Sequence, residues 1–213
     1  MDADEVEQGE TVTFWEDLYR SRPQAWSGKV NPVLATEVAD LPPGTVLDLG
    51  CGEGGDAIWF AERGWRVTAV DVSQLAIDRG RARAAELGLT DHIEWVRVDL
   101  GATVPGGPFD LVSAQFLQSP IAFPRADVLA AAARAVAPGG SLVTVSHAAF
   151  PPGSQHEHSD LVLPTPEREL ADLQLAEGEW DVLRAEIASR QAQRDGKDVT
   201  LEDTVVHVRR HPA

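Results

Sequence analysis

Cysteine is almost absent from this sequence of 213 residues, and positive charge is scarce. Cys51 is the only cysteine, so no disulfide can form within the chain. The 18 Lys and Arg residues face 34 Asp and Glu residues, which gives a formal net charge of −16. Such a surface repels phosphate backbones and anionic lipids, so we expect neither nucleic acid nor a membrane as partner.

Long apolar runs are missing as well. No segment approaches the ~20 residues that a membrane-spanning helix needs. The first residues, Met-Asp-Ala-Asp-Glu-Val-Glu, are acidic, whereas a signal peptide begins with basic and then apolar residues. We therefore expect a cytoplasmic location.

Between residues 45 and 146, short apolar runs alternate with segments of helical periodicity. Alternating strands and helices predict a parallel sheet with helices on both faces, so the fold class is α/β. The expected strands are 46–49, 67–70, 93–98, 109–114 and 142–146, and the expected helices between them are 56–63, 74–87 and 125–137. We expect the second of these helices to bury Ile77, Ala84 and Leu87.

The flanking segments have a different pattern. Before the strands we expect two helices, one from Thr11 and one from Pro32 to Leu41 with Asn31 as N-cap. After them we expect a helix over 166–175, then a hairpin of strands 182–190 and 204–209 that turns near Asp195-Gly196. We interpret residues 1–213 as one domain: an acidic tail (1–10), a helical cap (11–44), a ligand-binding core (45–146), a loop or lid (147–166), and a C-terminal helix and hairpin (167–213).

The segment Val46-Leu47-Asp48-Leu49-Gly50-Cys51-Gly52-Glu53-Gly54-Gly55 predicts a strand that runs into a glycine-rich turn before a helix. Glycines let a ligand approach the backbone closely. Gly50, Gly52 and Gly55 fit the G-x-G-x-x-G pattern of dinucleotide sites. Gly50, Gly52 and Gly54 fit equally well the G-x-G-x-G loop of S-adenosylmethionine (SAM) enzymes. The glycines alone do not decide between the two.

Two carboxylates help to decide. Asp71 ends the second expected strand, where a carboxylate can accept both ribose hydroxyls of either ligand. Asp48 lies two residues before the first glycine. An acid there repels a pyrophosphate but attracts the ammonium group of a methionine moiety, so Asp48 favours SAM over NAD.

The core then resembles the class I SAM-dependent methyltransferases over residues 45–146. Four further segments carry the resemblance in the family's order: Val70-Asp71-Val72-Ser73, Arg97-Val98-Asp99-Leu100, Phe109-Asp110-Leu111-Val112-Ser113-Ala114-Gln115 and Ala137-Pro138-Gly139-Gly140-Ser141-Leu142. The aromatic stretches 14–19 and 26–32 are similar to small-molecule members of the tellurite-resistance and thiopurine type. The resemblance implies a Rossmann-like, doubly wound sheet of seven strands with one antiparallel strand near the C-terminus.

The resemblance also implies a SAM site. In it Asp71 holds the ribose, Asp99 accepts from the adenine amino group, and Leu100 packs on the ring. The predicted site comprises Asp48, Gly50, Cys51, Gly52, Gly54, Asp71, Val72, Asp99, Leu100, Ala114 and Gln115. We expect Cys51 to be a small packing residue whose N–H faces the ligand.

On the acceptor side, His147 follows the fifth strand and is the candidate general base. Trp26 and Gln115 are candidates for contact with the acceptor, as are the segments 11–32, 115–123 and 147–166. His156-Glu157-His158 with Asp160 has a spacing that is plausible for metal ligands, but no defined set of three or four ligands emerges, so we predict no metal site.

These features predict methyl transfer from SAM to a small molecule through an oxygen, nitrogen, sulfur or metalloid atom. Two alternatives stay open: a nicotinamide-dependent oxidoreductase and a SAM-binding module without catalysis. The oligomeric state is also open, a homodimer included.

Overall fold

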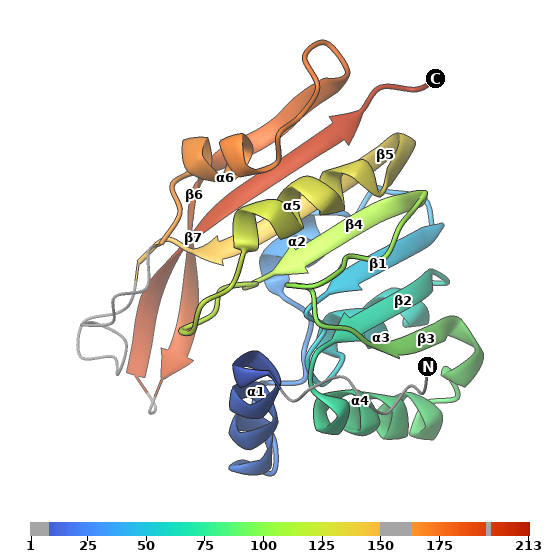
Figure 1. Ribbon diagram of the computed structural model, residues 1–213, viewed down its shortest axis with the longest axis vertical. Helices are drawn as coiled ribbons and strands as arrows, with labels where there is room; N and C mark the ends of the chain where they lie inside the picture. Colours follow the sequence, from blue (N-terminus) through green and yellow to red (C-terminus); the bar gives the residue numbers. More distant parts are fainter. Residues whose placement is uncertain (1–8, 150–162, 195–196) are drawn as a thin grey trace.

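A seven-stranded sheet forms the centre of the computed structural model, which describes residues 9–149, 163–194 and 197–213. Its strand order is β3-β2-β1-β4-β5-β7-β6 (Figure 1). The strands are β1 (Thr45–Leu49), β2 (Arg66–Asp71), β3 (Ile93–Arg97), β4 (Phe109–Gln115), β5 (Val136–His147), β6 (Trp180–Arg194) and β7 (Lys197–Arg210). β7 alone runs antiparallel to its neighbours β5 and β6. The predicted α/β fold with one antiparallel strand near the C-terminus is confirmed.

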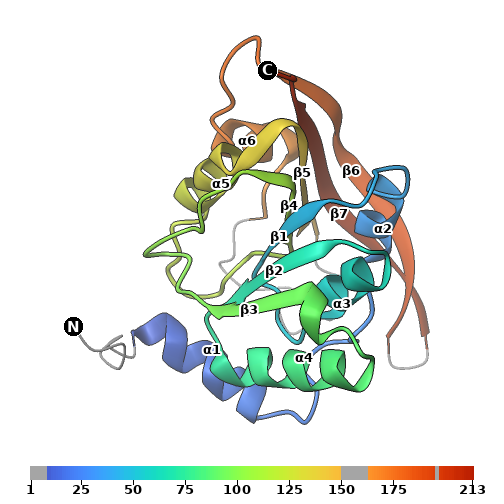
Figure 2. The same cartoon turned by 90° about the vertical axis from the view of Figure 1, so that its right-hand side faces the viewer.

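Helices cover both faces of the sheet (Figures 1 and 2). α5 (Arg125–Arg134) and α6 (Pro166–Asp172) lie on one face, while α2 (Pro32–Glu37), α3 (Gly55–Glu62) and α4 (Gln74–Glu86) lie on the other. α1 (Glu10–Arg20) packs against α4, and a short 3₁₀ helix spans Thr90–His92. Each layer has its own hydrophobic core, one around Leu49 and Leu129 and the other around Val46 and Phe60.

Local signals placed several helix ends correctly. Asn31 caps α2, because its side chain accepts from the N–H of Val33, and Pro32 follows at the first helical position. The hydroxyl of Ser73 caps α4 by accepting from the N–H of Ala76. Gly64, with φ +83°, follows the end of α3. These helix ends agree with the predictions from the sequence, because a capping bond joins residues that are close together in the chain.

Three expected helices are too long at their C-terminal ends. α2 ends at Glu37, so Leu41 lies outside it, and α6 ends at Asp172. α5 ends at Arg134, and Pro138-Gly139-Gly140 belongs to an irregular start of β5, where pairing with β4 shifts register. Leu87 is 49% exposed and does not join the core. Leu41, Ala135 and Leu173 lie past these helix ends and still pack in or against the hydrophobic cores, so the apolar pattern outlasts the helix.

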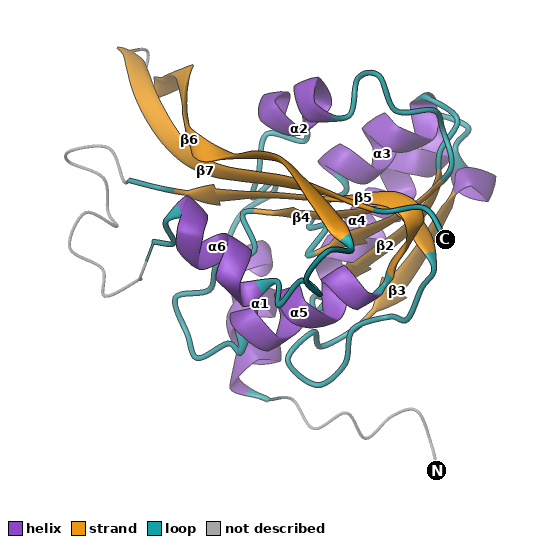
Figure 3. Cartoon of the chain, turned by 90° about the horizontal axis from the view of Figure 1, so that it is seen from above, coloured by secondary structure: helices purple, strands orange, loops and turns teal. Residues whose placement is uncertain are grey.

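The closing hairpin is longer than expected, since β6 and β7 pair from Trp180↔Arg210 to Arg194↔Lys197. Figure 3 shows the two strands extending beyond the neighbouring part of the sheet. The predicted turn at Asp195-Gly196, most of the loop 147–166 with His156, Glu157, His158 and Asp160, and most of the acidic tail lie outside the described residues. In the described ranges, no helix combines the length and hydropathy that a bilayer span requires.

Candidate active site

The sheet reverses its direction of growth between β1 and β4. The chain passes from β1 outward to β2 and β3, then returns to place β4 and β5 on the other side of β1. In such sheets ligands bind outside the carboxyl ends of the strands at the reversal point. Most of the predicted site residues follow these strand ends, so the topology brings them to one edge.

The glycine loop connects β1 to α3 with three residues in the left-handed region. Gly50, Gly52 and Gly54 have φ of +69°, +54° and +79°. Three of its N–H groups have acceptors within the protein. Those of Cys51 and Gly52 donate to the carbonyl of Val70 and the carboxylate of Asp71 in β2, at 2.9 and 2.8 Å, and that of Gly54 donates to the carbonyl of Cys51 at 2.9 Å. The expectation that the N–H of Cys51 faces a ligand is therefore wrong.

Asp71 holds the loop against β2. One carboxylate oxygen accepts from Gly52 at 2.8 Å and the other from the N–H of Ser73 at 2.9 Å. Burial raises the pKa of Asp71 to about 6, although these backbone donors pull it down. Each carboxylate oxygen has a second lone pair, so the residue can still accept hydrogen bonds from a diol.

Asp48 and Asp56 add two more carboxyl groups, the first buried and the second half-buried. Asp48 is 2% exposed, and its Oδ2 has no hydrogen-bond partner among residues 9–149, 163–194 and 197–213. Burial raises its pKa well above the usual range, and the charges of Asp56 and Asp71 raise it further. Burial raises the pKa of Asp56 to about 6, against the effect of its bond from the N–H of Asn31. An unpartnered buried carboxylate oxygen in this setting suits a cationic donor.

The segment after α1 covers the glycine loop. Trp26 donates through Nε1 to the hydroxyl of Tyr19 at 3.0 Å, and a Cβ at Gly52 would lie 3.0 Å from that hydroxyl oxygen and 3.3 Å from Cδ1 of Trp26. Glu53 accepts from the N–H groups of Ala25 and Trp26 and from Arg79. Tyr19 is buried, whereas half of Trp26 is exposed.

The residues expected to hold an adenine lie beyond β2 and β3. Leu100 is 8% exposed and packs in the core cluster of Leu49 and Val70. Asp99 accepts from the N–H of Gly101 through Oδ1 at 2.9 Å. Val72 is half-buried. The structure thus places these residues next to Asp71 along the sheet edge, and their contact with a base stays a prediction.

Gln115 connects β4 to the N-terminal segment. Its Oε1 accepts from Nδ2 of Asn31 at 3.0 Å, and its Nε2 contacts the hydroxyl of Ser113 and the carbonyl of Val143, both at 3.2 Å. Ala114 points to the other face of the sheet and is fully buried in the core. Any ligand contact of Ala114 therefore has to come from its backbone.

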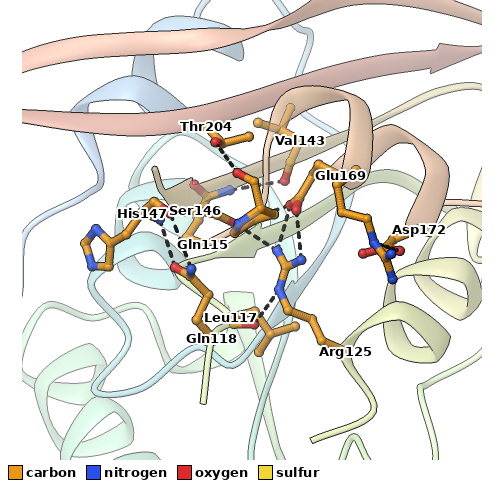
Figure 4. A network of polar contacts seen from close by, with 12 residues as sticks. Gln115, Leu117, Gln118, Arg125, Val143, Ser146, His147, Glu169, Asp172 and Thr204 are labelled. Atoms are coloured by element: carbon orange, nitrogen blue, oxygen red, sulfur yellow. Dashed lines mark hydrogen bonds and ion pairs between the residues drawn. The ribbon is translucent and has the colours of Figure 1, made fainter. Parts of the chain in front are cut away.

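A buried ion pair supports the edge from the opposite face (Figure 4). Arg125 binds both oxygens of Glu169 at 2.8 and 2.7 Å, the hydroxyl of Ser146 at 2.7 Å and the carbonyl of Leu117 at 2.8 Å. These bonds join α5, α6, β5 and the segment after β4. The ring of His147 points away from this pair, and its side chain is 36% exposed. His147 thus ends β5 at the carboxyl edge of the sheet, and its role there stays a prediction.

The sequence interpretation missed residues that come from distant elements. Asp203 of β7 and Arg190 of β6 lie beside His147, and Glu16 of α1 accepts from the N–H of Gln74 at 2.6 Å at the start of α4. No motif marked these residues. Only the register of the hairpin and the docking of α1 bring them to the site.

Part of the chain matches a known protein family. Residues 46–140 match the family described as "Methyltransferase domain". This part of the chain, which is less than half of its length, is similar to a methyltransferase domain. The match favours the methyltransferase interpretation over the nicotinamide-dependent alternative, and it begins and ends within the predicted core 45–146.

Curated proteins with similar sequences match part of the chain. A "probable thiol methyltransferase 2" of Arabidopsis thaliana is 30% identical over 101 residues, 46% of this chain and 45% of that protein. A "2-heptyl-1-hydroxyquinolin-4(1H)-one methyltransferase" of Mycobacteroides abscessus is 34% identical over 134 residues, 61% of this chain and 56% of that protein. The chain spans about half the length of these relatives.

Solved structures show the same fold over nearly the whole chain. The N-methyltransferase NodS of Bradyrhizobium japonicum, solved with S-adenosyl-L-homocysteine, aligns with a TM-score of 0.69 at 18% identity, covering 94% of this chain and 99% of NodS. TehB of Haemophilus influenzae aligns with a TM-score of 0.66 at 15% identity, covering 92% of this chain and 66% of TehB. At these identities the likeness concerns the fold.

Proposed function

We propose that the protein transfers a methyl group from SAM to a small-molecule acceptor. The observation that carries the proposal is the set of three carboxyl groups around the glycine loop, Asp48 and Asp71 buried and Asp56 half-buried. Three N–H groups of the loop, those of Cys51, Gly52 and Gly54, already have acceptors within the protein. A pyrophosphate needs free N–H donors and is repelled by carboxylates. A ligand with an ammonium group and a ribose diol needs acceptors, and this edge of the sheet supplies them.

The residues fit the parts of SAM in one order along the edge. The unpartnered Oδ2 of Asp48 suits the ammonium of the methionine moiety, the free lone pairs of Asp71 suit the ribose hydroxyls, and Asp99 with Leu100 suits the adenine. SAM supplies an electrophilic methyl carbon: the acceptor's lone pair forms the new bond, and the electrons of the broken carbon–sulfur bond stay on sulfur. The chain has to align the acceptor and exclude water.

The names of the relatives support a small acceptor. They describe methyl transfer to a thiol and to a hydroxyquinolone in those proteins. For this chain we propose the same broad class, with no nucleic acid as partner because of the net charge of −16.

The first test is calorimetric titration of the full chain with S-adenosylhomocysteine, with NADH as the paired control. Micromolar binding of S-adenosylhomocysteine alone is the expected result. Asp71→Ala should weaken binding at least tenfold, about 1.4 kcal/mol, while Asp91→Asn, on the exposed 3₁₀ helix, should leave the affinity unchanged. Binding of NADH alone would refute the proposal.

A catalytic role then requires transfer of a radiolabelled methyl group to a small acceptor. Tight binding of S-adenosylhomocysteine with no transfer to thiols, phenols, N-hydroxyl compounds or amines would favour the SAM-binding module without catalysis.

A further inference from the structure

The two edge strands of the sheet differ in length and in what they expose (Figure 3). β3, at one edge, is five residues long, and its exposed residues, Glu94 and Arg97, are both charged. β6, at the other edge, is fifteen residues long and contains neither lysine nor proline. Short length, charge and proline protect an exposed edge from pairing with another strand. β3 therefore has a protection that β6 lacks.

Exposed apolar side chains gather on β6. Among the described residues, five large apolar side chains are about half exposed, and three of these are on β6: Val182, Leu183 and Ile187, at 53%, 48% and 51%. In the described part of the chain, no strand pairs with the outer side of β6. An edge that combines unpaired backbone groups with apolar side chains is suited to pairing with an added strand.

The charge of this edge favours a second copy of the chain as the source of that strand. Residues 180–190 contain two acidic residues and two arginines, so the segment is neutral although the chain has a net charge of −16. Two copies of an acidic protein repel each other least where the local charge is balanced. A neutral edge also offers no attraction to a strongly acidic or strongly basic strand.

The order of the charges along β6 selects a register. When two copies of one strand pair antiparallel about a twofold axis, opposing residues share a face, so the axis passes through a single residue. An axis at Arg184 or Glu186 places like charges opposite each other, which is unfavourable. An axis at Ala185 places Arg184 opposite Glu186 of the second copy and brings Leu183 beside Ile187.

The geometry of a single copy prepares this charge pair. Nη2 and Nε of Arg184 lie 2.8 and 3.0 Å from Oε1 of Glu186, and Nη1 donates to Glu37 of α2. The Glu186 side chain is 60% exposed, so its second oxygen can accept from Arg184 of another copy. From Arg184 onward β6 pairs with β7 without a register shift. The centre of the contact is therefore regular strand.

We propose that a second copy of this chain docks on β6 in the antiparallel direction, with the twofold axis at Ala185. The two sheets then form one continuous sheet. The axis reverses the strand direction, so the carboxyl edges of the two copies point in opposite directions. The contact lies beside the sheet and leaves the end with the glycine loop uncovered, so each copy keeps its own site.

The first experiment is sedimentation velocity of the full chain over a range of concentrations. Wild type should show a monomer–dimer equilibrium. Ile187→Lys should raise the dissociation constant at least tenfold, about 1.4 kcal/mol, because a charged edge residue opposes pairing. Leu87→Lys makes a similar change at a residue that is 49% exposed outside this edge, and it should match wild type. A wild-type chain that stays monomeric at the concentrations used for calorimetry would overturn the proposal, as would a dimer that Ile187→Lys leaves intact.

The second experiment tests the charge pair in the same assay. Glu186→Arg places an arginine opposite Arg184 of the other copy and should also raise the dissociation constant at least tenfold. Glu94→Arg is the matched control, because it makes the same change on the exposed edge strand β3. It should leave the dissociation constant unchanged. Equal effects of the two variants would overturn the pairing of Arg184 with Glu186.

The third experiment locates the axis by cross-linking with a short bis-maleimide. In Ala185→Cys the two cysteines of a dimer lie directly opposite each other, with Cβ atoms about 5 Å apart, so a covalent dimer should form. In Ala188→Cys they lie about 20 Å apart along the strands, so no covalent dimer should form, and wild type, with Cys51 alone, should behave likewise. Cross-linking of Ala188→Cys without cross-linking of Ala185→Cys would overturn the axis at Ala185.

Binding of S-adenosylhomocysteine separates this inference from the proposed function. Ile187→Lys should bind it with wild-type affinity, and a weaker affinity would contradict independent sites in the two copies. A monomeric wild type that binds S-adenosylhomocysteine would overturn the docking surface alone. A dimeric wild type that does not bind it would support the docking surface and refute the proposed function.

Discussion

The contact between the glycine loop and β3 gives a sharp test of how the site is built. Trp95 places its indole against two glycines: a Cβ at Gly54 would lie 2.3 Å from Cη2 of the ring, and one at Gly80 would lie 2.5 Å from the same atom. Gly54 also has φ +79°. The loop therefore needs glycine at position 54 for its backbone conformation and for the space that Trp95 fills.

The cost of Gly54→Ala follows from these two terms. The left-handed conformation costs an alanine about 1–2 kcal/mol, and forcing a methyl group into the ring costs about 1–3 kcal/mol. Alanine also reduces the conformational freedom of the unfolded chain, which offsets about 0.4–1 kcal/mol of this destabilisation. We expect Gly54→Ala to lower the free energy of unfolding by about 2–4 kcal/mol.

Gly88→Ala is the matched control, because Gly88 has φ +72° and nothing within 4 Å of the added Cβ. It should cost about 1 kcal/mol or less. Urea denaturation followed by far-UV circular dichroism measures both variants, and Trp95→Leu should reduce the cost of Gly54→Ala in a double-mutant cycle. Equal losses in Gly54→Ala and Gly88→Ala, or no coupling to Trp95, would refute the packing argument.

Three further predictions concern other parts of the molecule. Because the folded chain keeps a proton on Asp71 up to about pH 6 while the unfolded chain loses it near 3.8, the stability of wild type relative to Asp71→Asn should be greatest below pH 4. It should then fall by about 3 kcal/mol as the pH rises through 6, and urea titrations at each pH measure this. Glu169→Leu leaves the guanidinium of Arg125 without its partner and should lower the free energy of unfolding by about 3–5 kcal/mol. Adding Arg125→Met should recover part of that loss. If the losses of the two single variants simply add in the double variant, the two side chains do not act as a pair. Tyr19→Phe removes the hydroxyl that accepts from Nε1 of Trp26. Because this Nε1 can donate to water instead, thermal denaturation should show that the stability falls by only about 1 kcal/mol.

The fold class and the position of the glycine loop at the carboxyl edge of the sheet could be predicted from the sequence. Apolar runs with short spacing marked the strands of the core, the glycines with Asp48 and Asp71 marked the ligand edge, and Asn31 and Ser73 marked helix starts. These features depend on residues close together in the chain, where periodicity, capping and steric freedom act directly. Helix C-termini were less well predicted, because core packing keeps the apolar spacing going beyond the last helical residue, as at Ala135 and Leu173.

Only the tertiary structure decided what these residues contact. The strand order β3-β2-β1-β4-β5-β7-β6 brings Asp203 beside His147, and the packing of β3 brings Trp95 against Gly54 and Gly80. Burial raises the pKa values of Asp48 and Asp71, and the N–H of Cys51 donates to the carbonyl of Val70 instead of facing a ligand. Desolvation and pairing across distant strands have no local signal, since both depend on which surfaces the whole chain removes from water.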